Sequence, residues 1–155
     1  MHCPNTGSMK NCVEHDAEVW LSESNNPKRK YRFTWEFLKT SRGHFIGINA
    51  ATANQLVKSA ILDGHLEELS DYRTVRSEVK YGQEGSRIDL LLQDIDLPDC
   101  YVEIKSVTLL ESPIVHGIGY FPDAVSERAA KHIRELSKMS AEGARTILFF
   151  CVQHT

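Results

Sequence analysis

The sequence predicts an α+β fold in two parts, a small β-barrel or sheet over residues 1–49 and an α/β unit over residues 50–155. Residues 31–37 alternate aromatic and polar side chains, which is typical of a half-buried strand. Residues 50–62 repeat apolar side chains at helical spacing. Residues 87–105 contain two strand-like runs that carry acidic residues. Together these observations place short strands first and a mixed sheet with helices second.

The composition is that of an ordinary globular domain, with 41% hydrophobic and 25% charged residues in a chain of 155. This length suffices for a substantial core. The formal net charge is −3, so no global basic field points to nucleic acid. Binding to a polyanion would therefore require a local basic patch.

The four cysteines form neither a C-x-x-C pair nor a zinc-binding pattern with histidine. Scattered cysteines of this kind indicate reduced thiols, and so a cytoplasmic protein. No apolar run approaches about 18 residues, so the sequence predicts no membrane span. The N-terminus lacks the basic-then-apolar pattern of a signal peptide.

The first part contains three expected strands, at residues 18–22, 31–37 and 44–48. Between the first two lies the densest basic cluster of the chain, formed by Lys28, Arg29, Lys30 and Arg32. Beside aromatic side chains on a small barrel, such a cluster could follow a phosphate backbone. The alternative is a solvated hairpin tip, because runs of charge often only face water.

The second part reads as helix, three strands, helix and strand. The expected elements are a helix at 50–62, strands at 72–81, 87–92 and 100–105, a helix beginning after 122 and a strand at 145–152. Three antiparallel strands followed by a helical crossover make a mixed sheet. The last strand is nearly all apolar, which predicts that both of its faces are covered.

The second helix follows a Gly- and Pro-containing linker at residues 112–122, and Asp123 or Ser126 can cap it. Its expected apolar stripe consists of Val125, Ala129, Ile133, Leu136 and Met139. Glu127 and Lys131 form an i,i+4 pair on the outer side. The histidines are dispersed and form no nucleophilic triad, so each is interpreted as ordinary, although His132 shares the charged side of this helix.

The central chemical feature is an acid on one strand and Glu-x-Lys on the next. In the strand period, Tyr101, Glu103 and Lys105 lie on one face, and Asp89 comes from the neighbouring strand. Metal-dependent nucleases of the PD-(D/E)xK type use this arrangement. The alternative is a set of cross-strand ion pairs, since each element alone is common in soluble strands.

In the nuclease interpretation, Asp89 and Glu103 would hold Mg²⁺ or Mn²⁺, with the carbonyl of Ile104 as a neutral ligand. Lys105 would orient or deprotonate a water that attacks a phosphodiester. Glu78, on the adjacent strand, would be a third acid or would fix the metal ligands in place.

Several stretches in order resemble the sugar fermentation stimulation protein A family of bacteria and archaea. They are HCPNTG at residues 2–7, NPKRK at 26–30, SRID at 86–89, YVEIK at 101–105, and GYFPDA at 119–124 followed by ER at 127–128 and KH at 131–132. The resemblance implies an N-terminal OB-fold, a C-terminal nuclease-like domain, DNA binding and a part in regulating maltose-type sugar metabolism. Family members are longer at both ends, so we expect a partial barrel here.

These observations lead to one preferred function and two alternatives. The preferred function is DNA binding, through Lys28, Arg29, Lys30 and Arg32. The first alternative is a Mg²⁺-dependent nuclease acting through Asp89, Glu103 and Lys105. The second is a regulator that keeps a nuclease fold only for its binding surface. The sequence assigns no oligomeric state.

Overall fold

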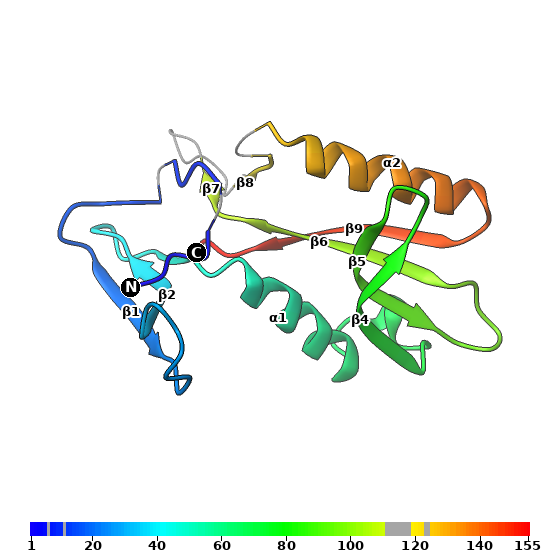
Figure 1. The fold of residues 1–155 in the computed structure, drawn as a ribbon, viewed down its shortest axis with the longest axis horizontal. Coiled ribbons are helices and arrows are strands. Elements are labelled where there is room, and N and C mark those ends of the chain that lie inside the picture. Colours follow the sequence, from blue (N-terminus) through cyan, green and yellow to red (C-terminus); the bar gives the residue numbers. More distant parts are fainter. Residues whose placement is uncertain (6, 11, 111–118, 123–124) are drawn as a thin grey trace. The chain divides into compact units, whose positions relative to one another are not determined.

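The computed structural model describes residues 1–155 except 6, 11, 111–118 and 123–124 (Figure 1). Contacts between residues divide the chain into two units. Unit 1 consists of Met1–Ala53, Ser106–Val125 and Cys151–Thr155, and unit 2 of Asn54–Lys105 and Ser126–Phe150. The predicted boundary at residue 49 remains a prediction. None of the helices in the described part of the chain is long and apolar enough to cross a membrane.

Unit 1 is built on a three-stranded antiparallel sheet in the order β1-β2-β3. Its strands are β1 (Glu18–Glu23), β2 (Phe33–Lys39) and β3 (Phe45–Gly47), which confirms the three predicted strands. The second strand begins later than residue 31 because the chain is still closing the β1–β2 loop there. Ser24 N–H donates to the Arg32 carbonyl at 2.9 Å.

Alternate residues of these strands turn inward, and Leu38, Ile46 and Ile48 form a fully buried cluster with Cys12. The chain segment around His2 runs beside β2, since His2 N–H donates to the Phe33 carbonyl at 2.7 Å. Unit 1 also contains a small two-stranded sheet of β7 (Leu109–Leu110) and β8 (Gly119–Tyr120).

A four-stranded sheet in the order β4-β5-β6-β9 forms the centre of unit 2. The strands are β4 (Thr74–Tyr81), β5 (Ser86–Gln93), β6 (Cys100–Val107) and β9 (Arg145–Val152). The first three are antiparallel neighbours. β9 runs parallel to β6, because Arg145 N–H donates to Asp99 at its start and Gln153 N–H to Val107 at its end. The predicted mixed sheet is therefore present.

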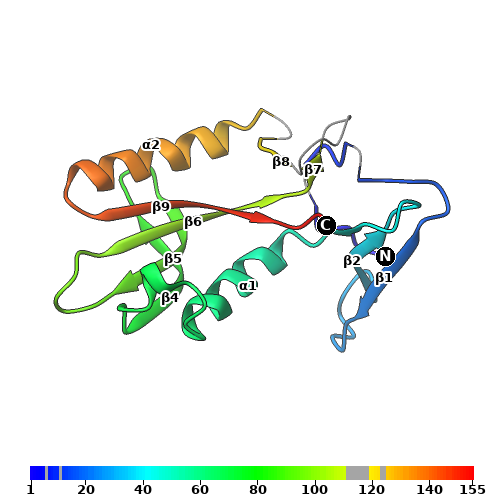
Figure 2. The same cartoon turned by 180° about the vertical axis from the view of Figure 1, so that it is seen from behind.

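Helices α1 (Ala51–Leu62) and α2 (Glu127–Ala141) lie on opposite sides of strands β6 and β9 (Figures 1 and 2). A 3₁₀ turn, η1 (Glu67–Leu69), follows α1. Ser126 caps α2, and its hydroxyl accepts the Ala129 N–H at 3.2 Å. The alternative cap, Asp123, and most of the expected linker at 112–122 lie outside the described residues.

The buried face of α2 differs from the predicted apolar stripe. Val125 is fully exposed ahead of the helix and Ile133 is 45% exposed. The residues that turn inward are His132, Glu135 and Leu136. The prediction is confirmed for Leu136 and Met139, which pack in the core, and wrong for Val125 and Ile133, because the polar side chains of His132 and Glu135 occupy inward positions. Lys131 also departs from expectation, since its Nζ donates to the Glu84 carbonyl at 2.5 Å.

The prediction that both faces of strand β9 are covered was wrong. Its burial alternates along the strand, and Leu148, Phe150 and Val152 are 36%, 49% and 59% exposed. The strand lies at the edge of the sheet, next to β6 only. The apolar run therefore predicted the strand correctly, but it did not predict how far each face of the strand is buried.

Candidate functional site

Asp89 lies where backbone pairing is interrupted on both sides of β5. In the β4–β5 ladder, Ser77 pairs with Leu90 and Val79 with Ile88, while Glu78, opposite Asp89, is not paired. The backbone of Glu78 is in the left-handed region (φ 57°), which is incompatible with the extended conformation of a paired strand residue. On the other side, the pairing of β5 with β6 ends at Leu90 and Val102. At Asp89, side-chain hydrogen bonds therefore replace the backbone hydrogen bonds of the sheet.

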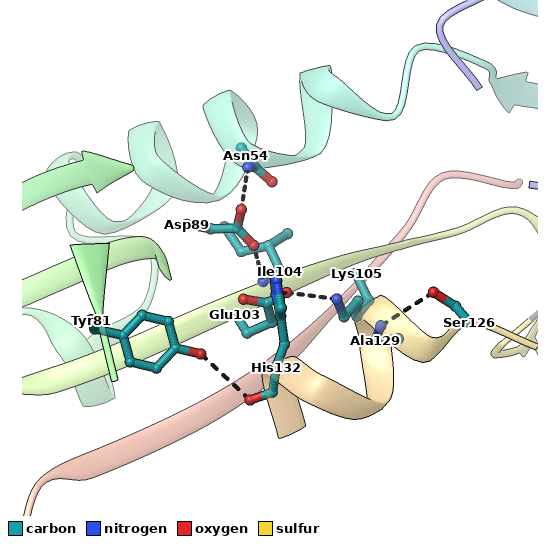
Figure 3. Close-up of polar contacts among 9 residues, drawn as sticks. All are labelled: Asn54, Tyr81, Asp89, Glu103, Ile104, Lys105, Ser126, Ala129 and His132. Atoms are coloured by element: carbon teal, nitrogen blue, oxygen red, sulfur yellow. Dashed lines mark hydrogen bonds and ion pairs between the residues drawn. The ribbon is translucent and has the colours of Figure 1, made fainter. Parts of the chain in front are cut away.

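The Asp89 carboxylate connects Asn54 of α1 to Ile104 of β6 (Figure 3). Its Oδ2 accepts the Ile104 N–H at 2.7 Å, a donor that a regular ladder would have used. Its Oδ1 accepts from Asn54 Nδ2 of α1 at 2.8 Å. Burial raises the pKa of Asp89; the Ile104 N–H opposes the rise, and the nearby Glu103 carboxylate adds to it.

Glu103 is almost completely buried, with 2% of its surface exposed. Its Oε1 lies 2.6 Å from Lys105 Nζ on the same strand and 2.6 Å from His132 Nδ1 of α2 (Figure 3). Its Oε2 has no hydrogen-bond partner among the described residues. A buried carboxylate held on one oxygen by two nitrogen groups keeps the other oxygen available for a ligand.

Tyr81 forms the remaining wall of this cluster. Its hydroxyl donates to the His132 carbonyl at 3.4 Å. Burial, and then the negative charges of Glu103, Glu135 and Asp89, raise the pKa of Tyr81. Tyr81 therefore stays a neutral donor beside these acids.

The structure brings together four of the predicted residues, Asp89, Glu103, Ile104 and Lys105. Ile104 contacts Asp89 through its N–H, whereas the predicted ligand was its carbonyl. Glu78 faces solvent and lines a pocket with His132. Its role as a third acid stays a prediction.

Sequence reasoning missed His132 and Asn54, which contact Glu103 and Asp89. A signal for His132 was present, because it lies three and four residues before Glu135 and Leu136, on one helical face. Asn54 adjoins the buried Ala53 in the first turn of α1, where a polar residue beside an apolar stripe is not unusual. Nothing local distinguishes it from a solvated residue.

The basic cluster of Lys28, Arg29, Lys30 and Arg32 belongs to unit 1, whereas the carboxylates belong to unit 2. All four cations are exposed. The Arg32 guanidinium pairs with Glu23, its Nε lying 2.6 Å from Oε1. Lys30 Nζ lies 5.3 Å from the centre of the Tyr31 ring. Arg32 is therefore already paired with an acid, which leaves three of these cations for a polyanion.

The oxygen atoms at this site suit a hard divalent cation, but the side chains alone are too few to complete its coordination. Two carboxylates lie beside each other and one buried oxygen is unpartnered, which suits Mg²⁺ or Mn²⁺. The described residues contain no group of three His, Cys, Asp or Glu side chains arranged to hold a metal. Such a cation would therefore need backbone, water or substrate oxygens as further ligands.

Comparison with known proteins resolves the family. Residues 1–48 match the "SfsA N-terminal OB domain", and residues 51–155 match the "Sugar fermentation stimulation protein RE domain". The chain belongs to the sugar fermentation stimulation protein family. The resemblance drawn from sequence stretches is thereby confirmed, as is the fold class of an OB domain followed by an α/β domain.

Among relatives of this family, a sugar fermentation stimulation protein homolog of Shewanella pealeana is 56% identical over the whole chain. One of Psychromonas ingrahamii is 52% identical. The chain spans 64% of the first relative and 68% of the second. The structure is also similar to that of Pyrococcus furiosus SfsA in complex with Ca²⁺, with a TM-score of 0.83 and 24% identity, over 97% of this chain and 61% of that one.

Proposed function

We propose that this protein binds DNA and that its α/β domain hydrolyses phosphodiester bonds with the help of a divalent cation. The observation that carries the proposal is the meeting of two carboxylates, Asp89 and Glu103, with Lys105 in a largely buried site. Placing two acids together inside a protein raises the energy of the charged forms. A bound cation would remove that cost.

Each residue would have a distinct role. Asp89 and Glu103 would hold Mg²⁺ or Mn²⁺ between β5 and β6. When bound, the cation would neutralise charge on the phosphodiester and lower the pKa of an attacking water. Lys105 would hold and orient that water, and His132 would fix the Glu103 carboxylate by its Nδ1 contact of 2.6 Å.

A relative supports the choice of ion class. The Pyrococcus furiosus protein of the same fold is described in complex with Ca²⁺. Calcium and magnesium share a preference for carboxylate and carbonyl oxygens, which are the ligands that Asp89 and Glu103 offer.

Cation binding is the first test. Titration calorimetry of wild type with Mn²⁺ or Mg²⁺ should show binding that Asp89→Asn removes. Asp63→Asn is the matched control, because it removes one exposed carboxylate of the same unit. Equal affinity in wild type and Asp89→Asn, with DNA present, would exclude Asp89 as a ligand.

Cleavage is the second test. Cation-dependent cleavage of supercoiled or single-stranded DNA should disappear in Lys105→Ala and persist in Lys80→Ala, which removes an exposed lysine of the same unit. Circular dichroism would verify that both variants remain folded. Cleavage that persists in folded Lys105→Ala would reject the assigned role of Lys105.

A specific observation also favours a binding surface on unit 1. The Trp20 ring stacks on Phe37 at 5.3 Å and approaches Phe45 at 5.5 Å, and Lys39 Nζ lies 5.7 Å from the centre of the Phe45 ring. Exposed aromatic rings beside cations are the features by which OB-folds bind single strands. Replacing Phe37 and Phe45 by Leu should weaken binding of a single-stranded oligonucleotide while the sheet remains folded.

The alternative of a regulator without turnover makes a different prediction. Such a protein would bind DNA with strong salt dependence and show no cleavage with any divalent cation. A part in sugar metabolism and a cytoplasmic location are consistent with either version. DNA affinity that does not change between about 50 and 200 mM salt would reject both versions of DNA binding.

A further inference from the structure

A second feature of unit 2 lies beside the carboxylates. A pocket of about 560 Å³ opens between the turn-proximal part of the β4–β5 hairpin and α2. Six charged residues line it: Arg87, Arg128, Lys131, Arg134, Glu78 and Glu127. His132 and two small residues of the hairpin complete the lining, which contains no aromatic or large apolar side chain.

The side chains that line the pocket have a positive net charge, although the net charge of the whole chain is negative. Its lining carries four cations and two acids, a balance of 4 − 2 = +2 with histidine neutral. The whole chain has a formal charge of −3. A concave surface with positive charge attracts anions even on a negatively charged protein. Salt screens the more distant negative charges beyond a Debye length of about 8–10 Å.

Backbone carbonyls hold two of the cations, Arg87 and Lys131, whereas Arg134 is paired with an acid. Arg87 Nη1 donates to the Glu78 carbonyl at 3.1 Å, and Lys131 Nζ donates to the Glu84 carbonyl. Both acceptors are backbone groups. Glu84 pairs with Arg134 at 3.2 Å and lies 3.8 Å from Lys138, so one acid is shared by two bases.

Arg128 makes no hydrogen bond or ion pair with a side chain in the described residues. It lies in the first turn of α2, after the Ser126 cap. An exposed guanidinium that lines a pocket is free to bind two oxygens of one phosphate group. This residue gives the cleanest probe of the pocket, because its removal breaks no side-chain hydrogen bond or ion pair among the described residues.

The pocket adjoins the candidate site through two residues. His132 lines the pocket and also holds Glu103 by its Nδ1. Glu78 lines the pocket from the strand position that faces Asp89 across the sheet. An anion bound in the pocket would therefore be separated from the Glu103 carboxylate by the His132 side chain.

We infer that this pocket holds the sugar–phosphate backbone of a nucleic-acid strand next to the bond presented to Asp89, Glu103 and Lys105. The inference rests on the proposed function and adds to it the place where the strand is held. Walls that carry more cations than acids suit a phosphate backbone, which is bound without reading bases. A pocket of this volume accommodates more than a single phosphate.

The test measures strand affinity without any divalent cation, so it does not depend on turnover. Binding of a labelled 20-nucleotide DNA strand to the full 155-residue chain is followed by fluorescence anisotropy in EDTA, at several salt concentrations. The variants are Arg128→Gln and the double variant Arg87→Gln/Arg128→Gln. Arg76→Gln is the control, because Arg76 is an exposed arginine of the same hairpin that does not line the pocket.

The double variant should weaken binding about tenfold or more at low salt and reduce the salt slope by about two, one per phosphate contact. Arg128→Gln should reduce the slope by about one and Arg76→Gln should not change it. If all three variants weaken binding equally, only net charge matters and the inference is wrong. It is also wrong if the pocket variants bind normally while Lys28→Gln/Lys30→Gln binds weakly.

Competition separates a strand from a small phosphate. If inorganic phosphate or a deoxynucleoside monophosphate displaces the strand at equal phosphate concentration, the pocket binds a phosphate group and the inference of a strand is overturned. The cation titrations described above keep the two proposals apart. If the protein binds the cation but the pocket variants bind the strand normally, the metal site is supported and the pocket is rejected. If the pocket variants bind the strand weakly but the protein binds no cation, the pocket is supported and the metal site is rejected.

Discussion

Two glutamates of unit 2 are buried to the same degree and do different things. Glu103 is 2% exposed and Glu135 is 0% exposed. Each also has an Oε2 without a hydrogen-bond partner among the described residues. An orphaned buried oxygen therefore does not by itself mark a functional site.

The surroundings of the two carboxylates differ. Glu135 is held by the hairpin turn: its Oε1 accepts the Glu84 N–H at 2.6 Å, and its carboxylate contacts Gly82 so closely that a Cβ there would overlap it. Burial works to raise the pKa of Glu135, but the Ser86 hydroxyl and the Glu84 N–H outweigh it, so the pKa is lowered. Glu135 is a charged residue that fastens the β4–β5 turn to α2.

Glu103 has a second acid as its neighbour. Asp89 has a raised pKa, and the Glu103 charge is one of the causes. Folding gains nothing from bringing two acids together, whereas a cation or a reaction can. The comparison teaches that the pairing of acids, rather than burial, distinguishes a candidate site from a structural anchor.

The largest expected effect is on cation affinity. Glu103→Gln should lower the affinity for Mn²⁺ about a hundredfold or more, because it removes a charged ligand. Glu135→Gln should leave the affinity within about twofold, since its carboxylate contacts the turn and not Asp89. Calorimetric titration of both variants measures the difference, and similar losses would remove the distinction between the two glutamates.

The next effect is on stability. Glu135→Ala should lower the free energy of unfolding by about 2–4 kcal/mol, because the Glu84 N–H loses its acceptor and a cavity remains. Glu103→Gln should cost less, about 1–2 kcal/mol, because relief of the repulsion with Asp89 offsets part of the loss of the buried ion pair with Lys105. Urea denaturation checks both values. A larger loss in Glu103→Gln than in Glu135→Ala would contradict the assigned roles.

A smaller effect is expected at the turn that Glu135 contacts. Gly82→Ala should cost about 1–3 kcal/mol, because Gly82 has φ 67° and a Cβ would overlap the Glu135 carboxylate. Gly85→Ala is the control, since Gly85 has φ 66° with open space around it and suffers only backbone strain. In a Glu135→Ala background the two glycine substitutions should become equal in cost. A persisting difference would show that Glu135 does not crowd Gly82.

The smallest effect is a pH dependence from Asp89. Because its pKa is raised in the folded protein, the folded state binds a proton more readily than the unfolded state. Stability from this group is therefore gained as the pH falls from neutral towards the unfolded pKa of about 3.9. Relative to Asp89→Asn, wild type should become more stable between about pH 7 and 4, measured by urea denaturation. A wild type that loses stability relative to Asp89→Asn as the pH falls would show that the pKa is lowered instead.

Local patterns in the sequence were enough for the elements and for the centre of the site. Alternation along β6 placed Glu103 and Lys105 on one face, and the 2.6 Å contact between them agrees with it. The Ser126 cap also followed from residue type. These features depend on neighbours within a few residues, where the periods of strands and helices are fixed.

Burial on α2 and β9 could not be predicted in the same way. The apolar pattern assigned Val125 and Ile133 to the core, but the rotation of α2 on the sheet buries His132 and Glu135. That rotation is set by contacts with Tyr81 and the hairpin turn, which are about 50 residues away in the chain. A buried charge is stable there only because its partners are in place.

The sequence by itself therefore determined the family, the order of helices and strands, and the association of Asp89 with Glu103 and Lys105. Only the tertiary structure decided that Asn54 and His132 complete the surroundings of these acids, that Glu78 breaks the ladder beside Asp89, and that four cations form a pocket next to them. The reason is physical. Spacing along one strand is fixed by covalent geometry, whereas contacts between distant segments depend on how their surfaces fit together.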